Sequence, residues 1–219
     1  DLVSKSRKIS PNSEIELNSE GFFRSAEFIS TYISDVDSII GDINISFNID
    51  GPRKSLKRNG VIVLSNTSIY NVLMDEPMKR IGAQAQLVNN ILTIDSFKGS
   101  LTSSNDRKTQ ADNFSLSGNI DFTKFFEPRY AINANGKNVF FRSLNQDIES
   151  YADLEVFISG KDTVDVTGTI SAKNGAIYKE FVGGESTRSS DEKGRVVTNY
   201  NIRFPIEDTF AIRNSQIDA

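Results

Sequence analysis

Paired carboxylates are the side chains in this sequence whose type and spacing come closest to catalytic chemistry. A glycosidase needs two carboxyl groups that face each other across a cleft, and spacing along a chain does not show facing. The pairs lie in polar stretches where aspartate commonly forms turns. We therefore expect no catalytic residue among them. They are Asp35/Asp37, Asp147/Glu149, Asp162/Asp165 and Asp191/Glu192.

Residue types that are absent exclude most other chemistry. The chain has 219 residues with no histidine and no cysteine. Ser-His-Asp and Cys-His catalysis, His- or Cys-ligated zinc and disulfides therefore cannot be built. Asp35 and Asp37 are not followed by the ligands and glycine of a calcium loop, and residues 183–187 lack the lysine of a phosphate loop. The sequence predicts a protein that is not an enzyme and has no metal and no cofactor.

Charge and hydropathy exclude two further classes of interaction. The 25 basic residues are scattered among 29 acidic ones, with a net charge of −4, so we expect no nucleic-acid partner. The longest aliphatic run, residues 61–64, is far below the roughly 18 residues of a membrane helix. We expect no signal peptide within this sequence. The chain starts without methionine and stops in an apolar-alternating stretch, so we expect a piece of a longer polypeptide.

The elements that must position any site are mostly strands. Ile43, Ile45, Phe47 and Ile49 alternate with polar residues until Gly51-Pro52 ends the run. Strands with one apolar and one wet face are typical of antiparallel sheets, and no βαβ alternation is present. The sequence predicts an all-β fold with a mainly antiparallel sheet. The same alternation recurs at 81–87, 92–94, 116–122, 154–158 and 196–204.

One stretch has the period of a helix instead. Apolar residues spaced by four and three predict a short amphipathic helix over 22–36, on Phe22, Ala26, Ile29, Ile33 and Val36. We accordingly divide the chain into an N-terminal segment, 1–40, and a repetitive β domain, 41–219. The polar stretches 103–108 and 183–194 are predicted to be exposed loops.

A weak internal repeat runs through the β domain. Gly60, Asn66, Ile69 and Tyr70 recur 108 positions later. Their counterparts are Gly168, Asn174, Ile177 and Tyr178. A repeat of this kind predicts an elongated stack of strands, in which each unit needs its neighbours to cover its apolar face.

The order of glycines and alternating residues resembles a known family. The first copy is Gly41-Asp-Ile-Asn-Ile-Ser-Phe-Asn-Ile-Asp-Gly51-Pro52, followed by Gly60-Val-Ile-Val-Leu-Ser-Asn-Thr-Ser-Ile-Tyr70. The second copy is Leu154-Glu-Val-Phe-Ile-Ser-Gly160, followed by 166–170 and 174–177. This cadence is similar to the C-terminal domain family of TamB, the inner-membrane component of the translocation and assembly module. The resemblance covers roughly residues 20 to 219 and rests on common residues. Pro52 directly after its glycine, and Ser65-Asn66-Thr67 without a turn glycine, depart from the pattern.

The resemblance implies a fold and a function. The fold is a β-taco, a long sheet folded lengthwise into a U-shaped trough with an apolar concave face. The function is to conduct phospholipid or other acyl chains toward the outer membrane and to support outer-membrane protein assembly. The setting is the periplasm of a diderm bacterium, with an outer-membrane barrel protein of the Omp85 type as partner. The rest of the parent chain would supply membrane association, as an anchor in the inner membrane.

The alternating apolar residues are the predicted lining of that trough. The basic cluster Arg53, Lys54, Lys57 and Arg58 is a candidate contact for a lipid headgroup at its rim. The predicted lining residues are Ile43, Ile45, Phe47, Ile49, Ile62, Leu64, Leu92, Ile94, Leu116, Ile120, Phe122, Leu154, Val156, Ile158, Ile170, Tyr200, Ile202 and Phe204.

Alternation by itself leaves alternatives open. The same apolar faces would form the closed core of a two-sheet sandwich. In function, the alternatives are a chaperone that pairs its free sheet edges with unfolded barrel strands, and a carbohydrate-binding or adhesin sandwich. Unpaired edge strands also predict edge-to-edge self-association of this chain.

Overall fold

The residues that the structure describes fold as one open β-sheet of eleven strands and contain no α-helix. The structure is a computed structural model that describes residues 13–27, 36–72, 74–104, 111–124, 127–144, 147–161, 163–178 and 197–213, the side chains of 197 and 198 excepted. The strands are β1 Glu14–Ser25, β2 Val36–Pro52, β3 Lys57–Asn71, β4 Met78–Val88, β5 Ile91–Ser100, β6 Phe114–Asp121, β7 Arg129–Arg142, β8 Ile148–Gly160, β9 Thr163–Tyr178, β10 Val197–Arg203 and β11 Phe210–Arg213.

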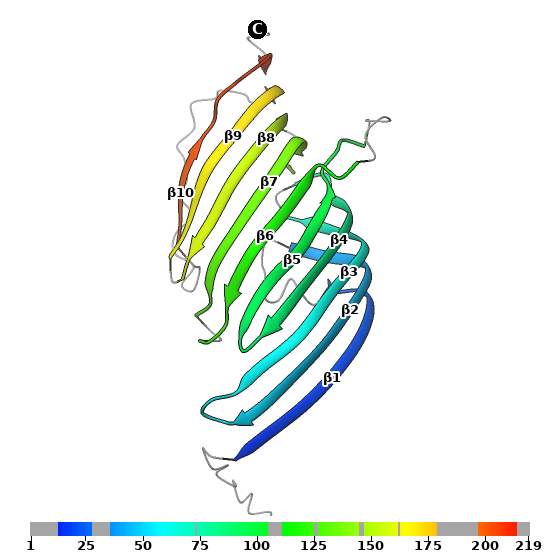
Figure 1. Cartoon of the computed structure of the whole chain (residues 1–219). Coiled ribbons are helices and arrows are strands. Elements are labelled where there is room, and N and C mark those ends of the chain that lie inside the picture. The colour runs from blue at the N-terminus through cyan, green and yellow to red at the C-terminus, as the bar shows by residue number, and fades with distance from the viewer. Residues whose placement is uncertain are drawn as a thin grey trace, which may run out of the picture.

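The strands lie side by side in chain order, as Figure 1 shows. Each strand from β1 to β8 pairs antiparallel with the next, and β10 and β11 both pair parallel with β9. The sheet is not closed, because β1 ends it on one side and β10 on the other. The prediction of an all-β, mainly antiparallel fold is confirmed.

A line of irregularities crosses the strands at matching positions and folds the sheet lengthwise. We call this line the crease. β-Bulges bend a strand locally, and three crease residues adopt left-handed backbone angles: Asn66 with φ 48°, Arg80 with φ 53° and Asn138 with φ 48°. The register shifts lie between Ile40 and Asp42, Leu64 and Thr67, Lys79 and Gly82, Ile94 and Lys98, and Gly136 and Val139.

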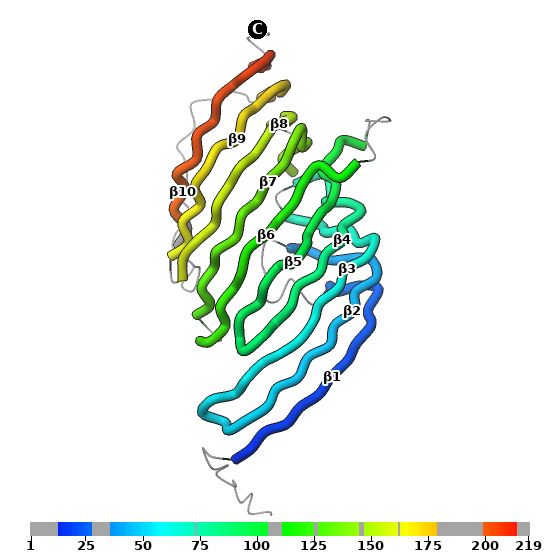
Figure 2. The backbone as a smooth tube through the Cα atoms, in the orientation of Figure 1, coloured from blue at the N-terminus to red at the C-terminus, as the bar shows by residue number. Residues whose placement is uncertain are grey.

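The crease divides the sheet into two walls. Figure 2 shows β2, β3 and β4 turning sharply at the right of the view, with their other ends behind the front layer. The first wall contains the long parts of β1 to β9 together with β10. The second wall consists of residues 36–40, 67–71, 78–81, 139–142, 148–151 and 175–178 and of β11.

The apolar face lies on the inside of this bend. At the crease, Ile81 and Thr67 are 0% exposed and Ile43 is 3% exposed, whereas Arg80 and Asn138 on the other side are exposed. A Cβ built on Gly136 would lie 2.7 Å from Cγ1 of Val139, so residues on either side of the crease come together there. Away from the crease the same face opens, with Leu17 48% and Tyr200 72% exposed. The fold is therefore an open trough and not a closed sandwich.

The predicted helix over 22–36 needs a correction. Phe22 lies in β1 and Val36 lies in β2, and Phe22 is the register partner of Asn44. Residues 28–35 lie outside the described residues. Of the five residues with this helical spacing, Phe22 and Val36 therefore lie in strands, and Ala26 follows the end of β1.

The boundary at residue 40 and the internal repeat can both be placed on this sheet. Position 40 falls inside β2, and β1 belongs to the same sheet as the strands that follow it. Gly60 lies in β3 and its repeat counterpart Gly168 lies in β9, and each of these strands is the second strand of a long hairpin. Tyr70 and its counterpart Tyr178 lie near the ends of the same two strands.

Candidate functional site

An uncharged line of residues crosses the whole first wall on its apolar face. Residues opposite each other in paired strands project from the same face. Following the register from β1 to β10 gives one continuous row with no charged or amide side chain. The row is Gly21, Ile45, Ile62, Ala85, Ile94, Gly118, Ile132, Ile158, Val166 and Tyr200.

The opposite face of the same strands is mixed, because Phe22, Val61 and Phe157 are exposed apolar residues on it. An adjacent line of register partners carries only polar or charged side chains: Lys98, Ser115, Asn135, Glu155, Thr169 and Arg203. The inner row therefore differs from the outer face in having no charged or amide side chain along its whole length.

Most of the predicted lining residues share the inner face. By register, all of them except Phe122 and Phe204 belong to it. Phe122 and Phe204 directly follow the last residues of β6 and β10, outside the ladder. Exposure rises along β2 from Ile43 at 3% to Phe47 at 37%, from the crease toward the rim.

Several inner-face residues were missed. Tyr130, Ile132 and Ala134 of β7 pair with Ile120, Gly118 and Leu116 of β6. In β7 the inner positions include alanine and glycine, which weaken the apolar alternation; a period-two scan that accepted small residues would have found this strand. Leu17 and Phe23 of β1 were hidden by the helical spacing that follows them.

The basic cluster is divided between the two faces. Arg53 and Lys54 lie in the exposed turn between β2 and β3. Lys57 pairs with Asp50 on the polar side, whereas Arg58 is the register partner of Ile49 on the inner face. The Nη1 atom of Arg58 donates a hydrogen bond to Oδ1 of Asn90 over 2.9 Å. Of the four predicted headgroup contacts, Arg58 has the position best suited to the rim of the trough.

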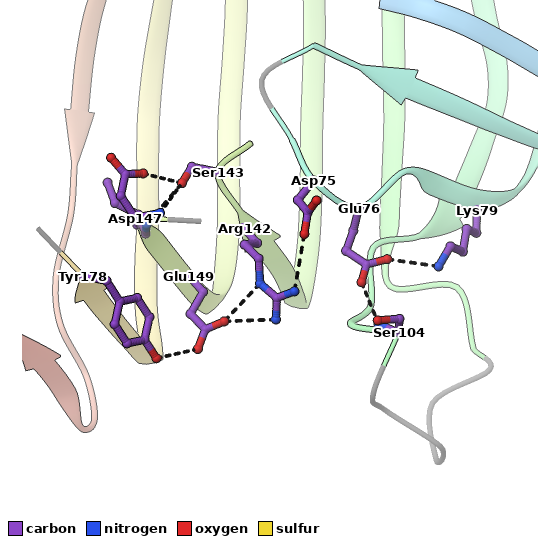
Figure 3. Close-up of polar contacts among 10 residues, drawn as sticks. Asp75, Glu76, Lys79, Ser104, Arg142, Ser143, Asp147, Glu149 and Tyr178 are labelled. Carbon is purple, nitrogen blue, oxygen red and sulfur yellow. Dashed lines mark hydrogen bonds and ion pairs between the residues drawn. The ribbon is translucent and has the colours of Figure 1, made fainter. Parts of the chain in front are cut away.

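A polar network joins the two halves of the second wall (Figure 3). Arg142 of β7 forms ion pairs with Asp75 at 3.4 Å and with Glu149 of β8 at 3.1 Å. The Tyr178 hydroxyl donates to Glu149 over 3.0 Å. Burial opposes the charge on Arg142, but the hydrogen bonds to Glu149 and Asp75 outweigh it and raise the pKa of the guanidinium. The network thus ties the β3–β4 connection to β7, β8 and β9.

A second carboxylate supports the same region. Glu76 is 9% exposed and accepts hydrogen bonds from the Ser104 backbone N–H at 3.0 Å and from Lys79 at 3.2 Å. Burial raises the pKa of Glu76, yet these hydrogen bonds more than compensate and the pKa is lowered overall. Glu76 is therefore a structural anion.

The acidic pairs that can be placed have structural partners. Asp147 accepts a hydrogen bond from the Ser143 hydroxyl, Glu149 belongs to the network above, and Asp165 accepts one from Asn199 at 3.0 Å. Asp35, Asp162, Asp191, Glu192 and residues 183–187 lie outside the described residues. Within the described ranges, no three potential metal ligands gather at one point.

The outer face has a hollow that sequence reasoning did not find. It has a volume of about 740 Å³, and Lys98, Asn135, Asp153 and Thr169 are among its lining residues. Asp153 forms an ion pair with Lys173 at 2.8 Å, and the hydrogen bond from Lys173 lowers the pKa of Asp153. Polar and apolar side chains both line the hollow, with Phe114 and Leu154 among the apolar ones.

Comparisons with known proteins add no relative. No family model matches the sequence, and neither a curated protein nor a solved structure matches it significantly. In the part of the chain that the structure describes, no helix has the length and hydropathy to cross a membrane. A function must therefore be inferred from the fold and from the two faces of its sheet.

Proposed function

We propose that the inner face of this sheet binds acyl chains and that the domain is a non-catalytic lipid trough. The observation that supports this best is the uncharged row that crosses ten strands on the inside of the bend. A soluble sheet exposes its apolar residues toward water only at a cost, and large exposed apolar surfaces commonly mark binding sites. The open rim gives a long ligand access along the whole row.

The dimensions and energies suit a lipid tail. Nine gaps of about 4.8 Å between the ten strands make the row about 43 Å long. Sixteen buried methylene groups would contribute on the order of 12 kcal/mol, at about 0.8 kcal/mol each. Because no charged residue interrupts the row, a bound acyl chain has similar surroundings at each strand. Such a uniform surface would allow the acyl chain to slide along the row.

The wider role rests on the family resemblance. We propose a periplasmic conduit that carries phospholipid toward the outer membrane and supports barrel-protein assembly, together with an Omp85-type barrel protein. Arg58 at the rim would then contact the headgroup phosphate, and other parts of the parent chain would provide the membrane anchor.

A second candidate function is that of a chaperone for outer-membrane barrel strands. The open edges of the sheet favour it, because β1 and β10 each have only one neighbour in the described sheet and an added strand could pair there. A chaperone role would need the main-chain groups of the edge strands and not the inner face. Substitutions on the inner face and substitutions on the edge strands can therefore distinguish lipid binding from chaperone activity.

A pair of neighbouring substitutions on β8 tests acyl-chain binding. Ile158 lies on the inner face and Phe157 on the outer face, so Ile158→Asp and Phe157→Asp place a carboxylate on opposite sides of one strand. We expect Ile158→Asp to weaken binding of a fluorescent long-chain fatty acid at least about tenfold, a change of roughly 1.4 kcal/mol. Phe157→Asp should bind like the unmodified chain.

Fluorescence titration, with circular dichroism to confirm that both variants fold, measures this difference. Equal weakening by both substitutions, or no binding by the unmodified chain, would refute the assignment of the inner face.

A further inference from the structure

The two edges of the sheet differ in how well they are protected against pairing. Natural edge strands commonly carry charges that discourage another strand from adding. The edge strand β1 has exposed Glu14, Glu16, Glu20 and Arg24 along its length. The edge strand β10 carries one charged residue, Arg203, at its end. By this criterion the charges of β1 protect it against pairing with another strand, and β10 lacks this protection.

The β10 edge also has exposed apolar side chains. Tyr200 of β10 is 72% exposed, and Phe204 and Ile206, which follow the strand, are 64% and 62% exposed. Among the residues that the structure describes, no strand pairs with the side of β10 that faces away from β9. Exposed apolar side chains beside free main-chain groups form a template for a further strand.

The sequence of β10 is complementary to itself about Tyr200. Asn199 and Asn201 flank Tyr200, and both pair with outer-face residues of β9, Asp165 and Thr167. Tyr200 pairs with the inner-face residue Val166. In an antiparallel pair of two β10 strands with a two-fold axis at Tyr200, the two tyrosines would face each other on the inner side. Each Asn199 would then face the other copy's Asn201 on the outer side.

We propose that β10 is a homodimerisation edge, at which two copies of this chain pair antiparallel with Tyr200 on the two-fold axis. At its centre this register places Tyr200 beside Tyr200 and amides beside amides, and it puts the inner faces of the two sheets on the same side. An isologous contact of this kind uses the same patch on both copies and closes at two. The proposal is independent of what the inner face binds.

The strength of association follows from the size of the contact. β10 has seven residues. A stable interface buries about 1,200 to 2,000 Å², so an edge of this length falls at the weak end of the range. We therefore expect a reversible monomer–dimer equilibrium that depends on concentration.

Single cysteines test the register directly, because the chain has no cysteine of its own. Facing Cα atoms in an antiparallel pair are about 4.5 or 5.5 Å apart, within the range that a disulfide spans. Tyr200→Cys should therefore give a disulfide-linked dimer on mild oxidation. Arg203→Cys should not, because the two copies of position 203 would be about 20 Å apart, six residues at 3.4 Å. Non-reducing gel electrophoresis and intact mass measure the linked fraction.

Charged variants test the same edge without a covalent bond. Tyr200→Lys places two lysines opposite each other at the axis, so sedimentation should show a monomer. Ser19→Lys on β1 is the matched control and should leave the dimer intact. A monomeric unmodified chain at high concentration, equal linking through positions 200 and 203, or loss of the dimer in Ser19→Lys alone would each overturn the proposal.

Discussion

Ile81→Asp is expected to abolish folding, whereas Ile158→Asp is expected to leave a folded chain. Ile81 is 0% exposed at the crease, where the two walls meet. Replacing isoleucine by aspartate there would remove the stabilisation from burying the isoleucine side chain, about 2 to 3 kcal/mol. The buried unpaired charge would lower the free energy of unfolding by several kcal/mol more. The sum is comparable to a typical domain stability of about 5 to 15 kcal/mol.

The same substitution at Ile158 has a different cost. Ile158 lies on the inner face in the middle of the first wall, partly exposed, and its carboxylate replacement can reach water through the open rim. We expect a loss of at most about 2 kcal/mol. Ile45→Asp and Ile202→Asp, whose sites are also partly exposed on the inner face, should behave in the same way.

Thermal unfolding followed by circular dichroism separates these cases. A cooperative transition for Ile158→Asp together with its absence for Ile81→Asp is the predicted pair of results. Unfolding of all three partly exposed variants would instead indicate that the inner face forms a closed core.

Gly168→Ala is expected to destabilise the chain by about 4 kcal/mol or more, although it adds a single methyl group. Gly168 has φ +144°, a backbone region that is nearly restricted to glycine. An added Cβ would lie 2.1 Å from the Glu155 carbonyl oxygen and 2.8 Å from Cα of Val156. Both atoms belong to the main chain of β8, so neither can rotate away and the β8–β9 ladder must separate.

Gly82→Ala is the matched control for this effect. A Cβ at Gly82 meets no atom within 4 Å and the backbone there is not left-handed. We expect Gly82→Ala to be neutral or to stabilise slightly, because alanine loses less conformational freedom than glycine. Urea denaturation of the two variants gives both free energies of unfolding, and similar values for both would contradict the backbone geometry described for β9.

The fold class and the orientation of the strands could be predicted from the sequence. Period-two alternation, as in Ile43 to Ile49, assigns alternate side chains to opposite faces without knowledge of the neighbours. For this reason the predicted inner-face residues on β2, β5 and β8 share one face once the register is known. The alternation does not contain the bend, so a trough and a sandwich remained equally compatible with it.

The crease and the edges could not be predicted, for physical reasons. Left-handed angles at Asn66, Arg80 and Asn138 depend on tertiary packing, and arginine in particular has no preference for them. Strand β1 was misassigned because its apolar residues continue into a helical spacing. The parallel pairing of β10 with β9 follows from a long connection, residues 179–196, which lies outside the described residues.

Native mass spectrometry of the purified chain, combined with extraction and identification of any bound lipid, tests the central claim most directly. We predict adducts whose masses match acyl lipids, present in the unmodified chain and in Phe157→Asp and lost in Ile158→Asp. A folded chain that carries no acyl lipid after purification, and takes none from added fatty acid, would contradict the proposal that the inner face is a lipid trough.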